Sequence, residues 1–213
     1  MKVYGETIFD IAYLIIAICV GIYILLNSKT KGQKLMGIAA LVLGLGDSFH
    51  LVPRMLNYFI DYDFSMALGV GKLVTSITMT IFYIFMYYIY LETFEIKENK
   101  KLTASVWVLS ILRIVLCLFP QNNWLTNESP LSWGIIRNIP FVILGILIVV
   151  LYFKEKNKNS IFKNIWLYVT LSFLFYIPVV VGANAVPMLG MFMLPKTICY
   201  ILIILSFKKQ ISK

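Results

Sequence analysis

The chain has 213 residues, of which 60% are hydrophobic and only 14% are charged, and its formal net charge is +9. Soluble domains are about half apolar and a quarter charged, so this composition excludes an ordinary water-soluble fold. A basic surplus can indicate nucleic-acid binding. Here most of the lysines lie between apolar runs, a pattern of membrane topology, so we expect no nucleic-acid partner.

Seven apolar runs are long enough for a helix to cross a bilayer, which takes about 20 residues. They lie near residues 7–26, 36–57, 66–91, 102–119, 133–153, 162–182 and 187–207. The expected fold is an all-α integral membrane protein, a seven-transmembrane-helix bundle that forms a single membrane domain over residues 1–213. The first run has Glu6 and Asp10 at its leading flank and no small-residue cleavage site behind it, which favours a span over a signal peptide.

The loop lysines predict the orientation of the bundle. Thirteen lysines lie on one side of the predicted membrane, in the loops after the first, third and fifth spans and in the C-terminal tail. The other side has Lys2, with Asp61, Asp63 and Glu128. By the positive-inside rule, the N-terminus is outside and the C-terminus is in the cytoplasm. We therefore expect a multi-pass protein of the cell membrane, and the lysine-, isoleucine- and asparagine-rich usage suggests a bacterial source.

Five cations remain, and each falls within a predicted span: Arg54, Lys72, Arg113, Arg137 and Lys196. A charge at the bilayer centre costs about 2.5–3.5 kcal/mol even on a lenient scale, so such residues face the bundle interior or water and are functional candidates. At about 1.5 Å per residue of helix, they lie in the middle and outer half of the membrane. The sequence therefore predicts a basic polar cavity that opens to the outside, above an apolar floor.

Helical spacing gathers further polar residues around these cations. Asp47, His50 and Arg54 are spaced i, i+3, i+7 and share one face of the second span. Ser76 lies one turn after Lys72 on the third span. The predicted ligand-binding residues are Arg54, Lys72, Ser76, Arg113, Arg137, Asn138, Tyr176, Lys196 and Tyr200.

Four prolines fall within predicted spans and are expected to act as hinges: Pro53, Pro140, Pro178 and Pro195. A proline within a helix frees a carbonyl and kinks the helix, which a membrane tolerates where neighbours or cavity water satisfy the backbone. Pro53 and Lys72 are 19 residues apart, and Pro178 and Lys196 are 18 apart. This similarity suggests a 3+1+3 pseudo-repeat in which Lys72 and Lys196 are equivalent.

A seven-helix plan with an external N-terminus resembles the architecture of sugar-exporting and PQ-loop transporters, microbial rhodopsins and seven-helix receptors, in topology alone. Lys196 resembles a retinal-linking lysine, but the third span has no acidic counter-ion, which argues against an opsin. Cys19, Cys117 and Cys199 all lie inside apolar runs, and the chain has one histidine. We therefore expect no disulfide framework, no metal site and no cofactor.

Three functions are compatible with these patterns. The first is binding or transport of a small anionic solute or lipid headgroup, since arginine and lysine recognise carboxylates and phosphates. The second is a metal-independent intramembrane enzyme that modifies lipids, with Asp47 and His50 as its acid/base pair. The third is a sensor or accessory subunit of a membrane complex. The expected partners are the lipid bilayer and the bound solute or headgroup. The sequence leaves open whether the chain also forms a homo-oligomer or binds a partner membrane protein.

Overall fold

The computed structural model describes residues 2–183 and 185–212, and over these the chain forms seven α-helices and two 3-10 helices, with no strand. In chain order they are α1 (Lys2–Asn27), α2 (Lys31–Leu56), α3 (Ser65–Thr93), α4 (Lys100–Leu118), η1 (Pro120–Asn122), α5 (Leu131–Lys154), α6 (Ile165–Gly182), η2 (Pro187–Phe192) and α7 (Met193–Ile211). Within this described part, seven helices are long and apolar enough to cross a membrane, the last of them including part of η2. The all-helical prediction is confirmed at that level.

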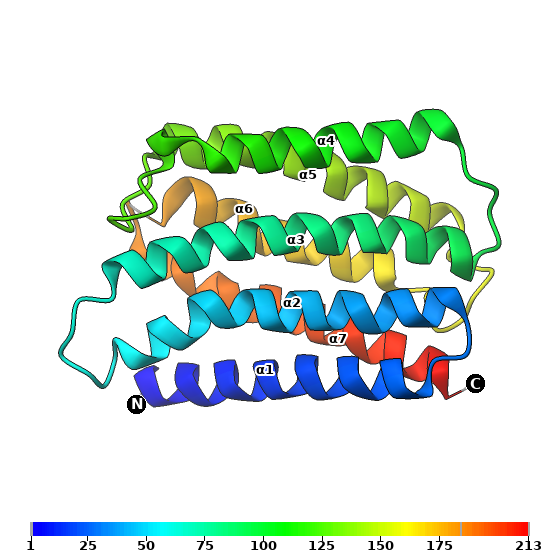
Figure 1. The fold of residues 1–213 in the computed structure, drawn as a ribbon, viewed down its shortest axis with the longest axis horizontal. Helices are drawn as coiled ribbons and strands as arrows, with labels where there is room; N and C mark the ends of the chain where they lie inside the picture. Colours follow the sequence, from blue (N-terminus) through cyan, green and yellow to red (C-terminus); the bar gives the residue numbers. More distant parts are fainter. Residues whose placement is uncertain (1, 184, 213) are drawn as a thin grey trace.

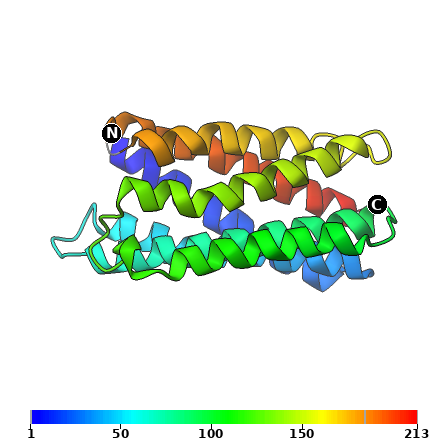
Figure 2. The ribbon, with the colours of Figure 1, turned by 90° about the horizontal axis from the view of Figure 1, so that it is seen from above.

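The helices run along one axis, and helices that follow each other in the chain pack side by side (Figure 1). α1 also packs against α7, which closes the helices into a ring, while α3 contacts α5 and α2 contacts α7. The two termini lie at opposite ends of the bundle (Figures 1 and 2). The N-terminal end also holds the connections α2–α3, α4–α5 and α6–α7. The C-terminal end holds the three lysine-rich connections.

Side-chain caps fix where two of the helices begin. At α2, the Thr30 hydroxyl accepts a hydrogen bond from the Gln33 N–H at 3.2 Å, and the Gln33 side chain accepts from the Thr30 N–H at 3.3 Å. This is a capping box. At α4, the Asn99 side chain accepts from the Lys101 N–H at 3.0 Å. Such caps satisfy N–H groups that the first turn leaves without a partner.

α2 and α3 come into backbone contact beside His50. Pro53 lies inside α2 and has no N–H to donate to the carbonyl of Phe49, four residues earlier. On α3, a Cβ added at Gly71 would overlap that Phe49 carbonyl oxygen and would lie 2.7 Å from the Cα of His50. Because only glycine fits this approach, Gly71 fixes α3 against the polar face of α2.

A buried aromatic layer fills the bundle from its centre toward the C-terminal end. Tyr83 packs edge-on against Phe141 and Phe173, with ring centroids 5.0 and 5.6 Å apart. Its hydroxyl lies 3.2 Å from that of Tyr200, and Tyr152 donates to a backbone carbonyl of α3 at 2.9 Å. Edge-to-face pairs of this kind add to the energy of apolar burial. The predicted apolar floor is thus built largely of aromatic rings.

Three of the four prolines lie inside helices as expected, namely Pro53 in α2, Pro140 in α5 and Pro178 in α6. Pro195 does not interrupt a helix, because it is the third residue of α7. A proline in the first turn gives up an N–H that has no partner within the helix. Since η2 ends just before Met193, the chain restarts its helix there and Pro195 frees no carbonyl.

Candidate functional site

A cavity of about 660 Å³ lies toward the N-terminal end of the bundle. All seven α-helices contribute to its wall, together with residues 127–130 of the loop before α5. Its lining includes all five cations that the sequence places within apolar runs: Arg54, Lys72, Arg113, Arg137 and Lys196. Helices that are far apart in the sequence therefore bring these charges to one place.

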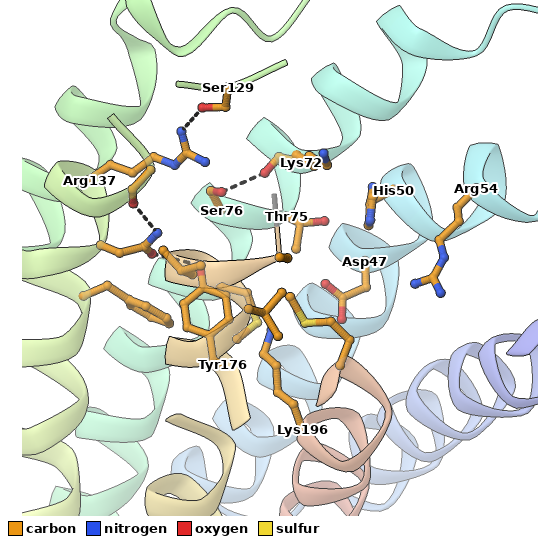
Figure 3. A pocket seen from close by; sticks show the side chains of 18 of the residues that line it. Asp47, His50, Arg54, Lys72, Thr75, Ser76, Ser129, Arg137, Tyr176 and Lys196 are labelled. Carbon is orange, nitrogen blue, oxygen red and sulfur yellow. Dashed lines mark hydrogen bonds between the residues drawn. The ribbon is translucent and has the colours of Figure 1, made fainter. Parts of the chain in front are cut away.

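Most of the predicted site residues line this cavity, and several project into it from different helices (Figure 3). They are Asp47, His50, Arg54, Lys72, Ser76, Arg113, Arg137, Asn138, Tyr176 and Lys196. The Tyr176 hydroxyl donates to Asn138 Oδ1 at 2.9 Å, which joins α6 to α5 at the wall. Tyr200 lies instead one turn beyond Lys196 on α7, buried beside Tyr83 in the aromatic layer.

Arg54 is largely neutralised within the protein. Its Nη2 lies 2.9 Å from Glu6 Oε2, and its Nε donates to the Tyr58 hydroxyl at 3.3 Å. The Tyr58 hydroxyl in turn donates to the same Glu6 oxygen at 2.9 Å. These three side chains tie α1 to the end of α2, so little of the Arg54 charge is left for a ligand.

Arg137 organises the loop between α4 and α5. Its Nη1 donates to Asn122 Oδ1 and to Ser129 Oγ, both at 2.6 Å. Its guanidinium carbon lies 4.5 Å from the centre of the Trp124 ring, and the Trp124 indole N–H donates to the Cys117 carbonyl at 2.7 Å. These partners are all neutral, so the charge of Arg137 stays available to an anion.

Arg113 is the most buried of the cavity cations. It is 2% exposed, and its guanidinium carbon lies 3.2 Å from the centre of the Phe141 ring. Its Nε and Nη1 are buried and have no hydrogen-bond partner among the described residues. An unsatisfied buried donor costs about 1–3 kcal/mol, and more when it is charged. The arrangement therefore costs stability unless a ligand supplies the missing acceptors.

Lys72 and Lys196 complete the basic set. The Nζ of Lys196 lies 4.6 Å from the centre of the Tyr176 ring, a cation–π contact. Within residues 2–183 and 185–212, neither lysine forms an ion pair, and the same holds for Arg113 and Arg137. Four of the five cavity cations are thus without a carboxylate partner in the part of the chain that the structure describes.

Three carboxylates also line the cavity, namely Asp10, Asp47 and Glu128. Asp47 Oδ2 accepts a hydrogen bond from the Tyr13 hydroxyl at 2.6 Å, a short charge-assisted bond. Asp10 is 4% exposed, and its buried Oδ2 has no hydrogen-bond partner in the described chain. Against these three acids stand five cations, so the lining carries a surplus of two positive charges.

The proposed acid/base residues Asp47 and His50 share one face of α2 and both line the cavity (Figure 3). In the described structure they are not hydrogen-bonded to each other. Asp47 is engaged by Tyr13 instead, and the buried Nδ1 of His50 has no partner there. The geometry thus gives Asp47 a fixed orientation and leaves the His50 nitrogen available to a ligand.

No group of three or more His, Cys, Asp or Glu side chains within the described residues is placed to hold a metal ion. Cys19 is exposed, whereas Cys117 and Cys199 are buried, and all three are free thiols. The expectations of no metal site and no cofactor stay predictions.

Sequence reasoning missed several neutral groups that shape the site. Tyr13 lies three residues after Asp10 on α1, so helical spacing could have placed it on the same face. Asn122 and Ser129 lie in an irregular loop, where no periodic signal predicts a contact with Arg137. In the sequence, Phe141 has no feature that distinguishes it from other core aromatic residues, yet its ring packs against the Arg113 guanidinium in a cation–π contact.

No protein-family model, curated protein or solved structure matches this chain. What the fold and site define is a class: a ring of seven apolar helices around a basic cavity.

Proposed function

We propose that this chain is a multi-pass protein of the cell membrane that binds and transports a small anionic solute or lipid headgroup through its basic cavity. One observation carries the proposal. Five cations from five helices line a single cavity, and four of them form no ion pair with any described carboxylate.

The orientation we propose places the cavity on the outer side of the membrane. Seven helices of sufficient length and hydropathy support insertion. Among the described residues, twelve lysines lie in or beside the connections and tail at the C-terminal end of the bundle, and the positive-inside rule assigns that end to the cytoplasm. The N-terminus and the end of the cavity that residues 127–130 line then face outward.

Energetics favour a functional reading of the cations over a structural one. Charges in an apolar bundle are costly, and structure alone usually retains them as pairs with opposite charges. Here Lys72, Arg113 and Lys196 lack such pairs within the described chain. A carboxylate or phosphate would supply the missing counter-charge and bidentate acceptors. A volume of about 660 Å³ falls within the usual range of small-ligand pockets.

Movement of the ligand requires the aromatic layer to open, and we propose that prolines allow it. Pro53, Pro140 and Pro178 interrupt three helices close to cavity-lining side chains. Each frees a carbonyl four residues earlier, which lowers the cost of bending. Lys72 and Lys196 line the same cavity from α3 and α7, which agrees with the proposed 3+1+3 repeat.

The proposal is tested with protein purified in an uncharged maltoside detergent. Binding of inorganic phosphate, ethyl phosphate and butyrate is measured by isothermal titration calorimetry, for the wild type and for Lys72→Gln and Lys196→Gln. The matched control is Lys97→Gln, because Lys97 is an exposed lysine at the C-terminal end of the bundle. We expect the two cavity variants to lose about tenfold or more in affinity, as the loss of one charge-assisted hydrogen bond implies, while the control does not change.

Transport is then tested in liposomes loaded with the labelled anion that binds best. Flux that falls in Lys72→Gln but not in Lys97→Gln supports the proposal. Equal binding by cavity and control variants refutes the anion site. Chemical conversion of added lipids that requires Asp47 and His50 would replace transport with the enzymatic alternative.

A further inference from the structure

The charges around the cavity are divided unevenly between two walls. Lys72, Arg113 and Arg137 come from α3, α4 and α5, whereas the carboxylates of Asp10 and Asp47 come from α1 and α2. The second wall also holds two cations, Arg54 on α2 and Lys196 on α7, a helix that packs against α1 and α2. In Figure 3, Arg137 and Asp47 extend from opposite sides of the drawn site, with Lys72 between them. The cavity is therefore polarised from one wall to the other, in addition to being basic as a whole.

The acidic wall has a carboxylate without a counter-charge bonded to it. Two cations lie on this side. The Nη2 of Arg54 is held by Glu6 at 2.9 Å, and Lys196 on α7 forms no ion pair with a described carboxylate. Asp10 is 4% exposed, and its Oδ2 has no hydrogen-bond partner in the described chain. Asp47 is oriented by Tyr13 through one oxygen. This wall is thus ready to accept hydrogen bonds from a cation.

The basic wall shows the complementary deficit. Arg113 is 2% exposed, and its Nε and Nη1 lack acceptors among the described residues. Arg137 is oriented by the neutral side chains of Asn122 and Ser129, which leaves its charge uncompensated. The acid nearest this wall in the chain, Glu128, is exposed to solvent, where its charge is screened.

We infer that the ligand is zwitterionic: a phosphate or carboxylate held by Lys72, Arg113 and Arg137, joined by a short linker to an ammonium held by Asp10 and Asp47. The inference rests on the proposed function and narrows its substrate class. A simple anion would satisfy the basic wall and leave the buried Asp10 oxygen unpaired. A zwitterion satisfies both walls, and unsatisfied buried polar groups are the costly alternative. A soluble amino-phosphate and a phospholipid headgroup both have this chemistry.

The test compares two matched pairs of probes on the protein in maltoside detergent. Phosphoethanolamine is compared with ethyl phosphate, and 4-aminobutyrate with butyrate, so that each pair differs by the ammonium. We expect the better zwitterion to bind about tenfold or more tightly than its partner, the effect of one charge-assisted hydrogen bond. Asp10→Asn, which keeps the shape of the side chain, should abolish that ratio without weakening the simple anion. Arg113→Gln should weaken both members of the pair.

Competition identifies the source of the headgroup. Displacement of bound phosphoethanolamine by micellar phosphatidylethanolamine, but not by phosphatidylglycerol, assigns the site to a lipid, and failure of both lipids assigns it to a free solute. Equal affinity for ethyl phosphate and phosphoethanolamine, and for butyrate and 4-aminobutyrate, overturns the zwitterion and leaves the anion proposal standing. Binding of none of the four probes overturns both. If Asp10→Asn fails to fold, Asp47→Asn provides the same comparison on the same wall.

Discussion

Replacing Arg113 with methionine should stabilise the protein while it weakens ligand binding. In the described structure Arg113 is 2% exposed, its Nε and Nη1 have no acceptor, and its guanidinium stacks on Phe141 at 3.2 Å. Methionine has a similar length, no donors and no charge. The substitution therefore removes the unsatisfied groups and largely preserves the packing.

The size of the effect follows from two opposing contributions. Removing two unsatisfied donors returns about 1–3 kcal/mol each. Losing the desolvated stack on Phe141 costs about 2 kcal/mol. The balance is a gain of about 2 kcal/mol, which for a chain of this size corresponds to a rise in Tm of about 4–8 °C. Replacing buried charges with apolar groups has stabilised other proteins by similar amounts.

Thermal unfolding in detergent, followed by a thiol-reactive or tryptophan probe, measures the change. The control is Leu109→Met on the same helix, an apolar exchange that should shift stability by less than about 1.5 kcal/mol. Calorimetry with the best anion should show the loss of binding in Arg113→Met alone. A fall in Tm for Arg113→Met with no change for Leu109→Met would refute the reasoning, because it would make Arg113 a stabilising structural residue.

Three further predictions concern the supports of the cavity. Tyr13→Phe removes the 2.6 Å hydrogen bond to Asp47 and should lower the unfolding free energy by about 1.5–3 kcal/mol in thermal or denaturant unfolding; an unchanged stability would mean that the bond contributes nothing. Gly71→Ala places a Cβ on the α2 backbone and should abolish the monodisperse peak in size-exclusion chromatography. In the control Gly134→Ala, the added Cβ meets no atom within 4 Å, so the protein should stay monodisperse and its unfolding free energy should rise by up to about 1 kcal/mol. Equal behaviour of the two variants would contradict the close approach of α3 to α2. Arg137→Gln removes two 2.6 Å hydrogen bonds and should speed proteolysis of the α4–α5 loop about tenfold or more, and an unaltered cleavage rate would show that Arg137 does not anchor that loop.

The helices were predictable because apolar run length is a local property of the sequence. Each run that reaches the thickness of a bilayer became one helix, and the lysine-rich connections lie together because helices alternate in direction. The start of α7 was less predictable. Residues 187–192 are as apolar as the helix that follows, yet they form a separate 3-10 helix. Composition does not distinguish these two conformations, so Pro195 was expected deeper in a helix than it lies.

The membership of the cavity was predictable, but its pairings were not. Depth and helical face indicate which side chains reach a common space, and Lys72 and Lys196 both line it. Which partners a cation finds depends on side chains far away in the chain. Glu6 and Arg54 are 48 residues apart, and their ion pair neutralises an arginine that the sequence analysis predicted to bind the ligand.

Several buried polar side chains around the cavity lack hydrogen-bond partners within the described chain. Elsewhere in the described interior, tyrosine hydroxyls find partners, as in the Tyr152 bond to α3 and the Tyr83–Tyr200 pair, and Thr93 Oγ1 is a buried exception. Around the cavity, Asp10, His50 and Arg113 each keep a buried atom without a partner in the described chain. Local conflicts of this kind concentrate at functional sites, where a ligand completes what the fold leaves open. An acid on one wall and a guanidinium on the other both lack hydrogen-bond partners, and one zwitterionic ligand would satisfy both.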